Sequence, residues 1–309
     1  MSEPITLAHS PDADDMVMWW PLCGMRDARG NPIEGDLGRP SIDTEGLTFC
    51  GIADDVQRLN RRAIDTGDYD VTAVSAHAYP YIADRYAVTS CGASFGEGYG
   101  PKVVVRADCT ADDLSSLPVS DTQPLAIPGR HTTAFLALRI LAGWDMPVCE
   151  MLFSRIPEAV ATGECGAGLL IHEAQLTFAA LGLRQVADLG AQWQARTGLA
   201  LPLGLNVIRR DLDVRHGRGT IGRVVRLLDR SIRYAVERAD LSHQFLLLHA
   251  DRRPEWRDAD LVHRYLSMYV SPMTLDMGEA GREAIKRLLG EGYGLGLSPD
   301  PGSIDVLWP

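Results

Sequence analysis

The sequence has no excess of positive charge, no closely paired cysteines and no long apolar run. Its 30 Lys and Arg against 41 Asp and Glu give a net charge of −11, whereas nucleic-acid-binding surfaces are basic. None of the six cysteines forms a Cys-x-x-Cys pair, which excludes the usual spacing of zinc sites. No segment approaches the roughly 18 consecutive apolar residues of a membrane span. We therefore expect neither a nucleic-acid partner nor a membrane partner.

The first residues, MSEPITLAHSPDADD, lack the basic and apolar regions of a secretory signal peptide. A chain of 309 residues, of which 46% are hydrophobic, can bury a sizeable core without disulfides. We therefore predict reduced cysteines and a cytoplasmic protein. Anionic substrates remain compatible with the acidic composition, because the field in a cleft need not follow the net charge.

Strand-like and helix-like segments alternate along the chain, which indicates an α/β fold. Helical patterns occupy residues 54–65 and 132–143, and an amphipathic helical region follows residue 210. The Gly- and Pro-rich segment 26–46 reads as a loop. Short apolar runs predict strands at residues 5–9, 71–75, 102–106, 125–128 and 206–210.

Two stretches of the chain, residues 66–82 and 162–178, align without gaps. Both run from a helix end through a Thr-Gly turn into a strand, then polar residues, then a new helix. Any two such units look somewhat alike, so a chance likeness is one explanation. Two copies also favour two similar lobes, whereas a solenoid needs at least three repeats.

Polar residues follow the strand in each of these two copies. They are Ser75 and His77 in the first, and His172 and Glu173 in the second. Ligands of open α/β sheets bind beyond the carboxyl ends of strands, so two facing lobes would direct both sets into one cleft. His172 itself could be a core residue, a metal ligand or a proton-transfer group.

Two turns that open helices are candidate binding elements. IPGRHTT, residues 127–133, turns on Gly129 and reaches a helix at Thr132, which makes either an anion site or a plain helix cap. The earlier turn SPDADD carries Asp12, Asp14 and Asp15. These carboxylates complement a helix dipole but would repel an anion, so a ligand there should donate hydrogen bonds.

The remaining glycine-rich segments carry no recognisable catalytic motif. GASFG, residues 92–96, matches a nucleophile elbow formally, but EGYGP follows it where a helix is required. Ser94 is therefore excluded as a nucleophile, and the glycines indicate a loop. No dinucleotide fingerprint and no metal motif is present in its required setting. We expect no metal and no cofactor.

Taken together, the motifs resemble those of the 1,4-dihydroxy-6-naphthoate synthases, a family of the futalosine route to menaquinone. The similarity spans about residues 5 to 290. Asp12 and Asp14 stand where the family usually has a cysteine and an asparagine. The segments that carry the resemblance, in order, are SPDADDMVMW, VSAHAYPYI, GEGYGP, IPGRHTTAFLALRI, LLIHEAQLTF, DLGAQW, TGLALPLGLNVIRRDL and YVSPMTLDMGEAGREAI.

The resemblance implies a two-lobed α/β fold like that of class II periplasmic binding proteins, with a cleft between the lobes. We expect residues 1–100 and 205–309 to form one discontinuous lobe and 101–204 the other. The crossovers should fall near GYGPKVV and LPLGLNV.

The same resemblance implies roles for individual residues. His172 occupies the position of the family's catalytic base, and Thr132 with Thr133 should bind an acidic group of the substrate. His77, after the equivalent strand of the other copy, is the second candidate for the base. Further substrate contacts are expected from Ser10, Asp14, Ser75, His77 and Gly129.

The implied reaction opens cyclic de-hypoxanthine futalosine and aromatises it to 1,4-dihydroxy-6-naphthoate, a carbon–carbon lyase step on a small carboxylate. A neutral imidazole can remove the proton at physiological pH. A chorismate dehydratase of the same pathway, a non-catalytic solute-binding protein and a ligand-sensing regulator are the alternatives. The sequence assigns no oligomeric state.

Overall fold

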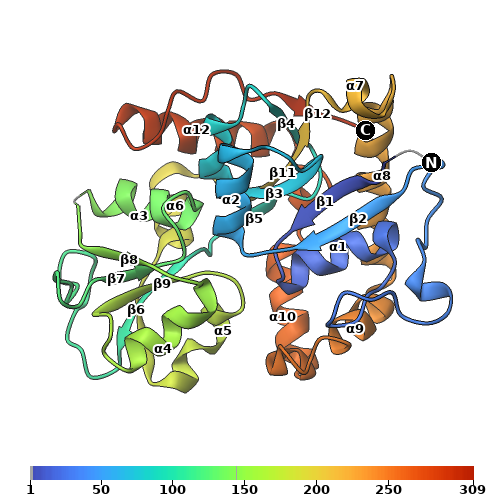
Figure 1. Ribbon diagram of the computed structural model, residues 1–309. Helices are drawn as coiled ribbons and strands as arrows, with labels where there is room; N and C mark the ends of the chain where they lie inside the picture. Colours follow the sequence, from blue (N-terminus) through green and yellow to red (C-terminus); the bar gives the residue numbers. More distant parts are fainter. Residues whose placement is uncertain (1–2, 144) are drawn as a thin grey trace.

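The computed structural model describes residues 3–143 and 145–309. Within these residues the strands form a seven-stranded and a five-stranded sheet, one in each of two lobes (Figure 1). The first sheet has the order β12 (Val306–Leu307), β4 (Tyr86–Thr89), β11 (Leu201–Arg209), β3 (Val71–Ser75), β1 (Ile5–His9) and β2 (Phe49–Ala53), with β5 (Ser94–Gly96) paired to β11. The second has the order β10 (Leu183–Asp188), β6 (Lys102–Arg106), β9 (Ala167–Leu170), β7 (Leu125–Ile127) and β8 (Val148–Glu150).

Helices pack against both sheets. The lobe of the first sheet contains the helices α1 (Ala13–Cys23), α2 (Val56–Asp65), α7 (Leu212–His216), α8 (Thr220–Glu237), α9 (Ala239–Leu247), α10 (Ala259–Tyr269), α11 (Pro272–Leu275) and α12 (Gly278–Gly294). The lobe of the second sheet contains the helices α3 (Thr133–Ala142), α4 (Ile156–Ala161), α5 (Ala174–Thr177) and α6 (Leu189–Thr197). Short 3-10 helices are η1 (Asp36–Gly38), η2 (Ala76–Tyr81), η3 (Phe153–Arg155), η4 (Phe178–Leu181) and η5 (Pro254–Arg257).

The two aligned stretches of sequence occupy equivalent places in the two sheets. Strand β3 lies between antiparallel β11 and parallel β1, and β9 lies between antiparallel β6 and parallel β7. A further parallel strand follows on the outer side of each, β2 beside β1 and β8 beside β7. The two lobes therefore share one strand arrangement, and the carboxyl ends of β3 and β9 both face the region between them.

The chain passes between the sheets twice, from β5 to β6 and from α6 back to β11. Strand β11 begins at Leu201, five residues before the strand predicted at 206–210. Residues 94–96, predicted as loop, form the edge strand β5, because they pair with β11 more than 100 residues later in the chain. Local pattern does not report such long-range pairing.

The start of α1 shows how the sequence builds the wall of the cleft. Asp12 caps this helix, accepting a hydrogen bond from the Asp15 N–H. Trp19 and Trp20 on the same helix are each only 1% exposed. Burial of side chains of this size stabilises the fold by about 1.5–3 kcal/mol each. The helix is therefore held firmly, and its first turn has a fixed position at the end of β1.

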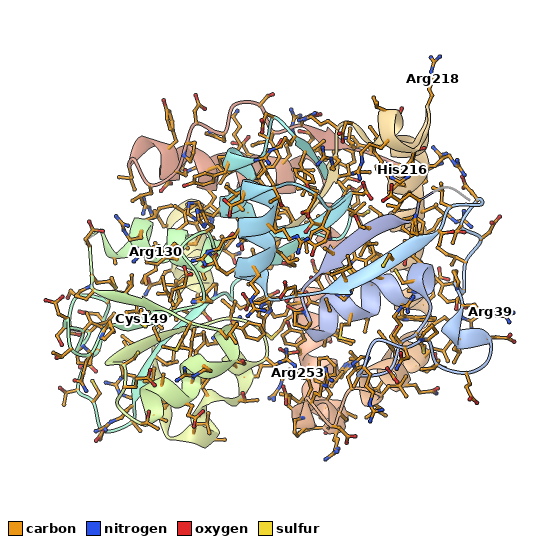
Figure 2. The ribbon with its side chains drawn as sticks, in the orientation of Figure 1. Arg39, Arg130, Cys149, His216, Arg218 and Arg253 are labelled. Atoms are coloured by element: carbon orange, nitrogen blue, oxygen red, sulfur yellow. The ribbon has the colours of Figure 1, made fainter. Side chains whose placement is uncertain are left out.

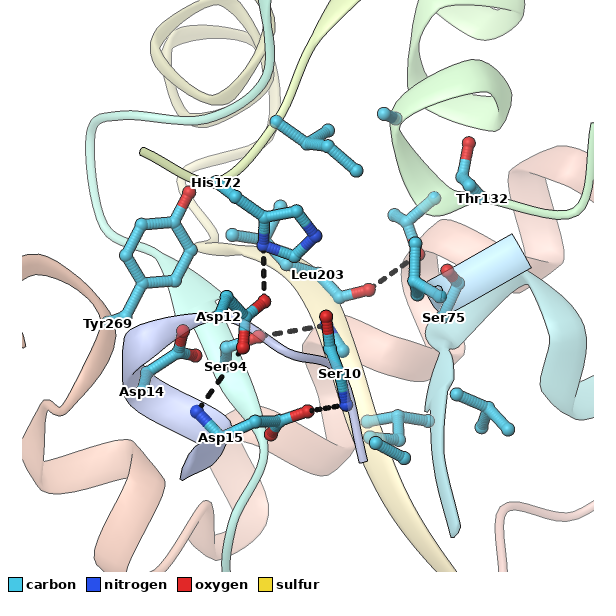
Figure 3. A pocket seen from close by; sticks show the side chains of 18 of the residues that line it. Ser10, Asp12, Asp14, Asp15, Ser75, Ser94, Thr132, His172, Leu203 and Tyr269 are labelled. Carbon is cyan, nitrogen blue, oxygen red and sulfur yellow. Dashed lines mark hydrogen bonds and ion pairs between the residues drawn. The ribbon is translucent and has the colours of Figure 1, made fainter. Parts of the chain in front are cut away.

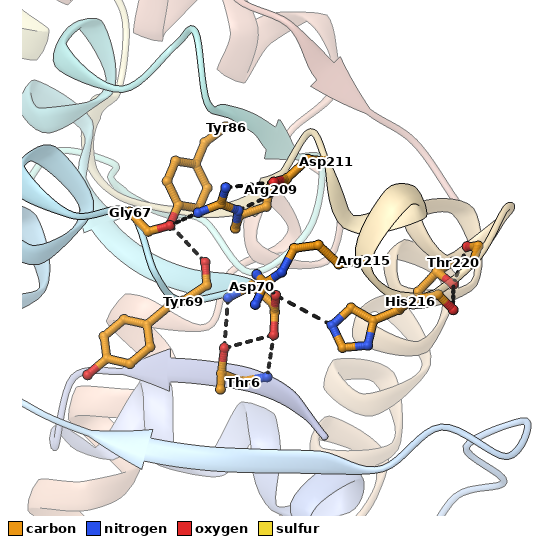
Figure 4. Close-up of polar contacts among 11 residues, drawn as sticks. Thr6, Gly67, Tyr69, Asp70, Tyr86, Arg209, Asp211, Arg215, His216 and Thr220 are labelled. Carbon is orange, nitrogen blue, oxygen red and sulfur yellow. Dashed lines mark hydrogen bonds and ion pairs between the residues drawn. The ribbon is translucent and has the colours of Figure 1, made fainter. Parts of the chain in front are cut away.

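A buried polar network joins the amino ends of β1 and β3, the ends away from the pocket wall (Figure 4). Asp70, just before β3, accepts hydrogen bonds of 2.9 Å from both the backbone N–H and the hydroxyl of Thr6 on β1. Arg215 on α7 pairs with the same carboxylate. The amino ends of β1 and β3 are thus fixed by structural contacts, which leaves their carboxyl ends to carry the site.

All six cysteines are free thiols in the part of the chain that the structure describes. Among those same residues, none of the helices combines the length and apolar character needed to cross a membrane.

Candidate active site

A pocket lies between the two lobes, where the carboxyl ends of β1, β3 and β9 meet (Figure 3). It encloses about 710 Å³, a volume that includes its solvent-open mouth. Its lining combines polar groups with apolar walls. The lining residues are Ser10, Asp12, Asp14, Asp15, Val56, Ala73, Val74, Ser75, Gly92, Ser94, Pro101, Thr132, Thr133, Ala134, Ile171, His172, Gln175, Leu203, Gly204, Leu205, Asn206 and Tyr269.

His172 enters this pocket from the second lobe, directly after β9. Its backbone has a φ of +54°, a left-handed conformation that few non-glycine residues adopt and that often marks functional positions. Its Nδ1 lies 2.5 Å from Oδ2 of Asp12, which belongs to the first lobe. The ring also packs edge-on against Phe153, with centroids 4.6 Å apart. Nε2 has no hydrogen-bond partner among residues 3–143 and 145–309.

The contact between Asp12 and His172 sets the charge of both groups. Burial alone would raise the pKa of Asp12, but the neighbouring imidazole outweighs it and lowers that pKa to about 2. Burial alone would lower the pKa of His172, but the charge of Asp12 and the hydrogen bond to it outweigh burial and raise it. Asp12 is therefore ionised, and His172 is a stronger base than an isolated histidine.

The other acidic groups around this pair behave differently. Burial, and then the charge of Asp12, raises the pKa of Asp15 to about 8. The pKa of Asp14 is also well above its usual value because of burial and the charges of Asp12 and Asp15. Burial raises the pKa of Glu173. The cluster thus carries less negative charge at neutral pH than its four carboxyl groups suggest.

Distance alone would allow Asp12, Asp14 and Asp15 to share a cation, because one oxygen from each lies within 4.8 Å of the others. Each carboxyl group already has a protein partner, however. Asp12 contacts His172, Asp14 accepts a hydrogen bond of 2.8 Å from the Tyr265 hydroxyl, and Asp15 accepts one of 2.7 Å from the Ser10 N–H. We assign no ion to this cluster.

The amino end of α3 forms the facing wall of the pocket. Thr132 caps the helix: its hydroxyl accepts a hydrogen bond from the Phe135 N–H and donates one to the Gly129 carbonyl. The Thr133 hydroxyl donates to the Leu203 carbonyl. Both hydroxyl protons are therefore used within the protein. The N–H groups of the first helical turn lack intrahelical acceptors and are suited to bind an anion.

Gly129 lies behind this wall, where the two lobes touch. A Cβ atom at this position would come within 2.3 Å of the Gln57 side chain on α2. Gln57 reaches across the lobes, with its Nε2 3.2 Å from Nδ1 of His131. The glycine thus permits a close approach between lobes and does not line the pocket.

Ser75 is the last residue of β3 and His77 follows the strand, but the two side chains have different surroundings. Ser75 lines the pocket, and its Oγ accepts a hydrogen bond of 3.0 Å from Nδ2 of Asn60. His77 is not among the lining residues; its ring lies beside Tyr81 and His131, with centroids 5.9 and 6.4 Å away. Burial, and then His131, lowers the pKa of His77 to about 4. This neutral, buried ring does not face His172 across the pocket.

The structure therefore brings together six of the eight site residues predicted from the sequence. Ser10, Asp14, Ser75, Thr132, Thr133 and His172 line the pocket, whereas His77 and Gly129 lie behind it.

Sequence reasoning missed Gln175, Asn206 and Tyr269 in the lining. Gln175 donates a hydrogen bond to the Tyr269 hydroxyl across the lobes. The i, i+4 spacing of Tyr265 and Tyr269 on one helix face could have indicated the tyrosine. No local signal marks Asn206.

Comparisons with known proteins agree with this geometry. A family model described as menaquinone biosynthesis matches residues 5–293. A protein of Thermus thermophilus named 1,4-dihydroxy-6-naphtoate synthase is 35% identical over 305 residues, covering 98% of this chain and 100% of that protein. A protein of Streptomyces coelicolor with the same name is 33% identical over 314 residues, covering 100% of this chain and 99% of that protein.

Solved structures show the same fold. The protein AF1704 from Archaeoglobus fulgidus has 36% identity and a TM-score of 0.78, covering 95% of this chain and 98% of that chain. The alkanesulfonate-binding protein SsuA from Xanthomonas axonopodis pv. citri, bound to MOPS, has a TM-score of 0.66 with full coverage of both chains. At 12% identity the latter likeness concerns the fold alone. The chain therefore has the two-lobed fold of periplasmic binding proteins.

Proposed function

The chain belongs to the menaquinone biosynthesis family, and on that premise we propose that it converts cyclic de-hypoxanthine futalosine to 1,4-dihydroxy-6-naphthoate. His172 acts as the general base. The observation that carries this assignment is its unpartnered Nε2 in a pocket between lobes, with Nδ1 held by Asp12. The reaction is then a proton abstraction followed by carbon–carbon cleavage, a lyase step that needs only acid–base groups.

The substrate is a small carboxylate, and the amino end of α3 is its anchor. Backbone N–H groups of Thr133 and Ala134 in the first turn hold the carboxylate, while the threonine hydroxyls fix the turn itself. Ser10, Ser75 and Asp14, whose pKa is raised by burial, contact the rest of the molecule. The acidic first turn of α1 faces polar hydroxyls of the substrate and not its carboxylate.

The sheet composition supports two lobes close to the predicted division, residues 1–100 with 205–309 and residues 101–204, except that β11 of the first sheet already begins at Leu201. These boundaries stay predictions, as do the cytoplasmic location and the substrate contacts of His77 and Gly129. Gly129 acts through the shape of the turn before α3, because a side chain there would meet Gln57.

Incubation of the purified protein with cyclic de-hypoxanthine futalosine tests the proposal directly. We expect 1,4-dihydroxy-6-naphthoate to form without added metal or redox cofactor. Chromatography and mass spectrometry would detect this product. Parallel incubation with chorismate should yield no dehydrated product. If the protein converts chorismate and does not convert the futalosine derivative, its function is that of a chorismate dehydratase and not the one proposed.

A further inference from the structure

Asp12 and His172 meet across the cleft and are buried together. The Asp12 side chain is 3% exposed and that of His172 14%, with 2.5 Å between Oδ2 and Nδ1. Figure 3 shows the carboxylate beneath the imidazole, at the start of α1. A contact this short between an ionised carboxylate and a ring nitrogen is a charge-assisted hydrogen bond in which Nδ1–H donates.

The direction of this hydrogen bond decides which nitrogen can act as a base. When Nδ1 carries the proton of a neutral imidazole, Nε2 keeps its lone pair. The left-handed backbone of His172 and the edge-on contact with Phe153 fix the plane of the ring. A carboxylate that holds a histidine in one tautomer and stabilises its charged form is a recurring arrangement in catalysis.

We propose that Asp12 is a positioning residue for His172, holding its imidazole in the Nδ1-protonated tautomer with Nε2 as the basic nitrogen in the pocket. The assignment rests on the proposed function in so far as His172 is the base. It also gives a role to the aspartate that stands where the family usually has a cysteine. Because the two residues come from different lobes, the pair exists only while the cleft is closed.

Asp12 has a second, separable contact. Its Oδ1 lies 3.4 Å from the Asp15 N–H and caps α1, whereas Oδ2 contacts His172. A purely structural aspartate would need only the first contact. Asparagine caps helices about as well as aspartate but carries no charge, so an Asp12→Asn variant keeps the cap and removes the ion pair.

Other charged groups near the ring do not replace Asp12. Glu173 and Asp15 also raise the pKa of His172, after Asp12, but burial raises their own pKa values, that of Asp15 to about 8. Asp55, the N-cap of α2, is near enough for the charge of His172 to lower its pKa, although burial raises that pKa more strongly. Arg253 donates to the Pro11 carbonyl and favours the ionised form of Asp12; Figure 2 shows it at the border of the lobes.

The test uses the ligand-free protein with ¹⁵N-labelled histidine, with the His172 signals assigned by their loss in a His172→Asn variant. In the unsubstituted protein we expect the Nδ1-protonated tautomer and a pKa above the usual 6.5. Asp12→Asn should lower that pKa by about one unit or more, since an adjacent opposite charge shifts a pKa by about 1–3 units. In Asp12→Ala, the neutral imidazole of His172 should also no longer be held in one tautomer, and a mixture of the two should be observed.

Kinetics give a second readout. Activity that requires neutral His172 has an acid limb at the pKa of that residue, and Asp12→Asn should move this limb of the kcat/KM profile to lower pH. Asp12→Ala should lower kcat by about 10–100-fold, as for other groups that orient a reactive histidine, with little change in KM. Asp14→Asn is the matched control for the pKa and the tautomer, because the Asp14 carboxyl contacts the Tyr265 hydroxyl whereas the Asp12 carboxyl contacts His172; it should leave both unchanged.

The outcomes separate this inference from the proposed function. An Nε2-protonated tautomer in the unsubstituted protein, or an unchanged His172 pKa in Asp12→Asn, overturns the role of Asp12 even if the enzyme forms naphthoate. If Asp12→Asn shifts the His172 pKa but the unsubstituted protein forms no naphthoate, the role of Asp12 is supported and the proposed function is wrong. If the Asp12 variants do not fold, the tautomer of the unsubstituted protein decides.

Discussion

At the residue scale, His172 combines three features that a structural histidine does not need. They are a left-handed backbone, an ionised partner at Nδ1 and, within residues 3–143 and 145–309, an Nε2 without a hydrogen-bond partner on a side chain that lines a pocket. The sequence placed this residue at a strand end but could not place Asp12 beside it. The two lie 160 residues apart and in different lobes, so only the closed fold shows the pair.

Replacing His172 with asparagine should lower turnover by roughly 10²–10⁴-fold, because asparagine can hydrogen-bond but cannot accept the proton at neutral pH. Substrate affinity should stay within a few-fold, since the proposed site for the substrate carboxylate is at the start of α3. Stopped-flow or steady-state kinetics would measure the first and calorimetry the second. The exposed His263 provides a control: His263→Asn should keep full turnover. Near-normal turnover in a folded His172→Asn variant would remove this residue from the mechanism.

The raised pKa of Asp15 makes a prediction for stability. With a pKa of about 8 when folded and about 3.8 when unfolded, the folded state binds more protons between these pH values. Stability should therefore fall as pH rises from about 4 to 8; below pH 4 both states are protonated and the cost is absent. The sign is opposite to that of a salt-bridged aspartate.

Asp15→Asn should flatten this pH dependence by up to about 1.4 kcal/mol per pH unit, the value for one proton. Urea titrations at pH 5, 6, 7 and 8, which lie between the unfolded and folded pKa values of Asp15, would measure this dependence. Asp43→Asn, at a surface turn far from the cluster, is the control. An equal slope in the Asp15→Asn variant and the unsubstituted protein would contradict a neutral, buried Asp15.

At the element scale, the sequence pattern predicted helices, whose backbone hydrogen bonds are local, and strands that consist of a short apolar run. Helix α2 and strand β6 were found within two residues, and the cap at Thr132 was read from its motif. Strand β5 and the first half of β11 were missed because glycine and proline weaken their local signal and their pairing is long-range. Asn60, which positions Ser75 from α2, has no sequence signature at all.

The contact between α2 and the turn before α3 should control substrate affinity. In Gly129→Ala the new Cβ would displace Gln57, which breaks the contact with His131 across the lobes. Because Gln57→Ala removes the same contact directly, both single variants should bind substrate more weakly by several-fold. The double variant should bind no more weakly than Gly129→Ala alone, because that variant has already lost the Gln57 contact and the strain of an alanine at a φ of +156° is common to both. Additive losses would show that Gly129 acts independently of Gln57.

At the scale of the whole molecule, the lobes are closed on each other through buried contacts. One hydrophobic cluster includes Val74 and Leu205 of the first sheet and Val103 and Leu169 of the second. On the other side of the pocket, Glu173 of the second lobe accepts hydrogen bonds from the Ala13 N–H and the Trp256 indole. The roles proposed for His172 and Asp12 require this closed arrangement, because each lobe supplies one of the two groups.

Glu173→Ala should favour an open molecule, because the N–H groups of Ala13 and Trp256 would lose their buried acceptor and gain water only when the cleft opens. Losing hydrogen bonds to a buried group costs about 1–3 kcal/mol, so substrate affinity should fall by about 5- to 150-fold. Small-angle X-ray scattering should show a larger radius of gyration without ligand that returns to the original value at saturating substrate. Glu164→Ala, which removes only an exposed pair with Arg155 of the same lobe, should change neither quantity. A Glu173→Ala variant with unchanged scattering and weakened binding would place Glu173 in substrate contact and not in closure.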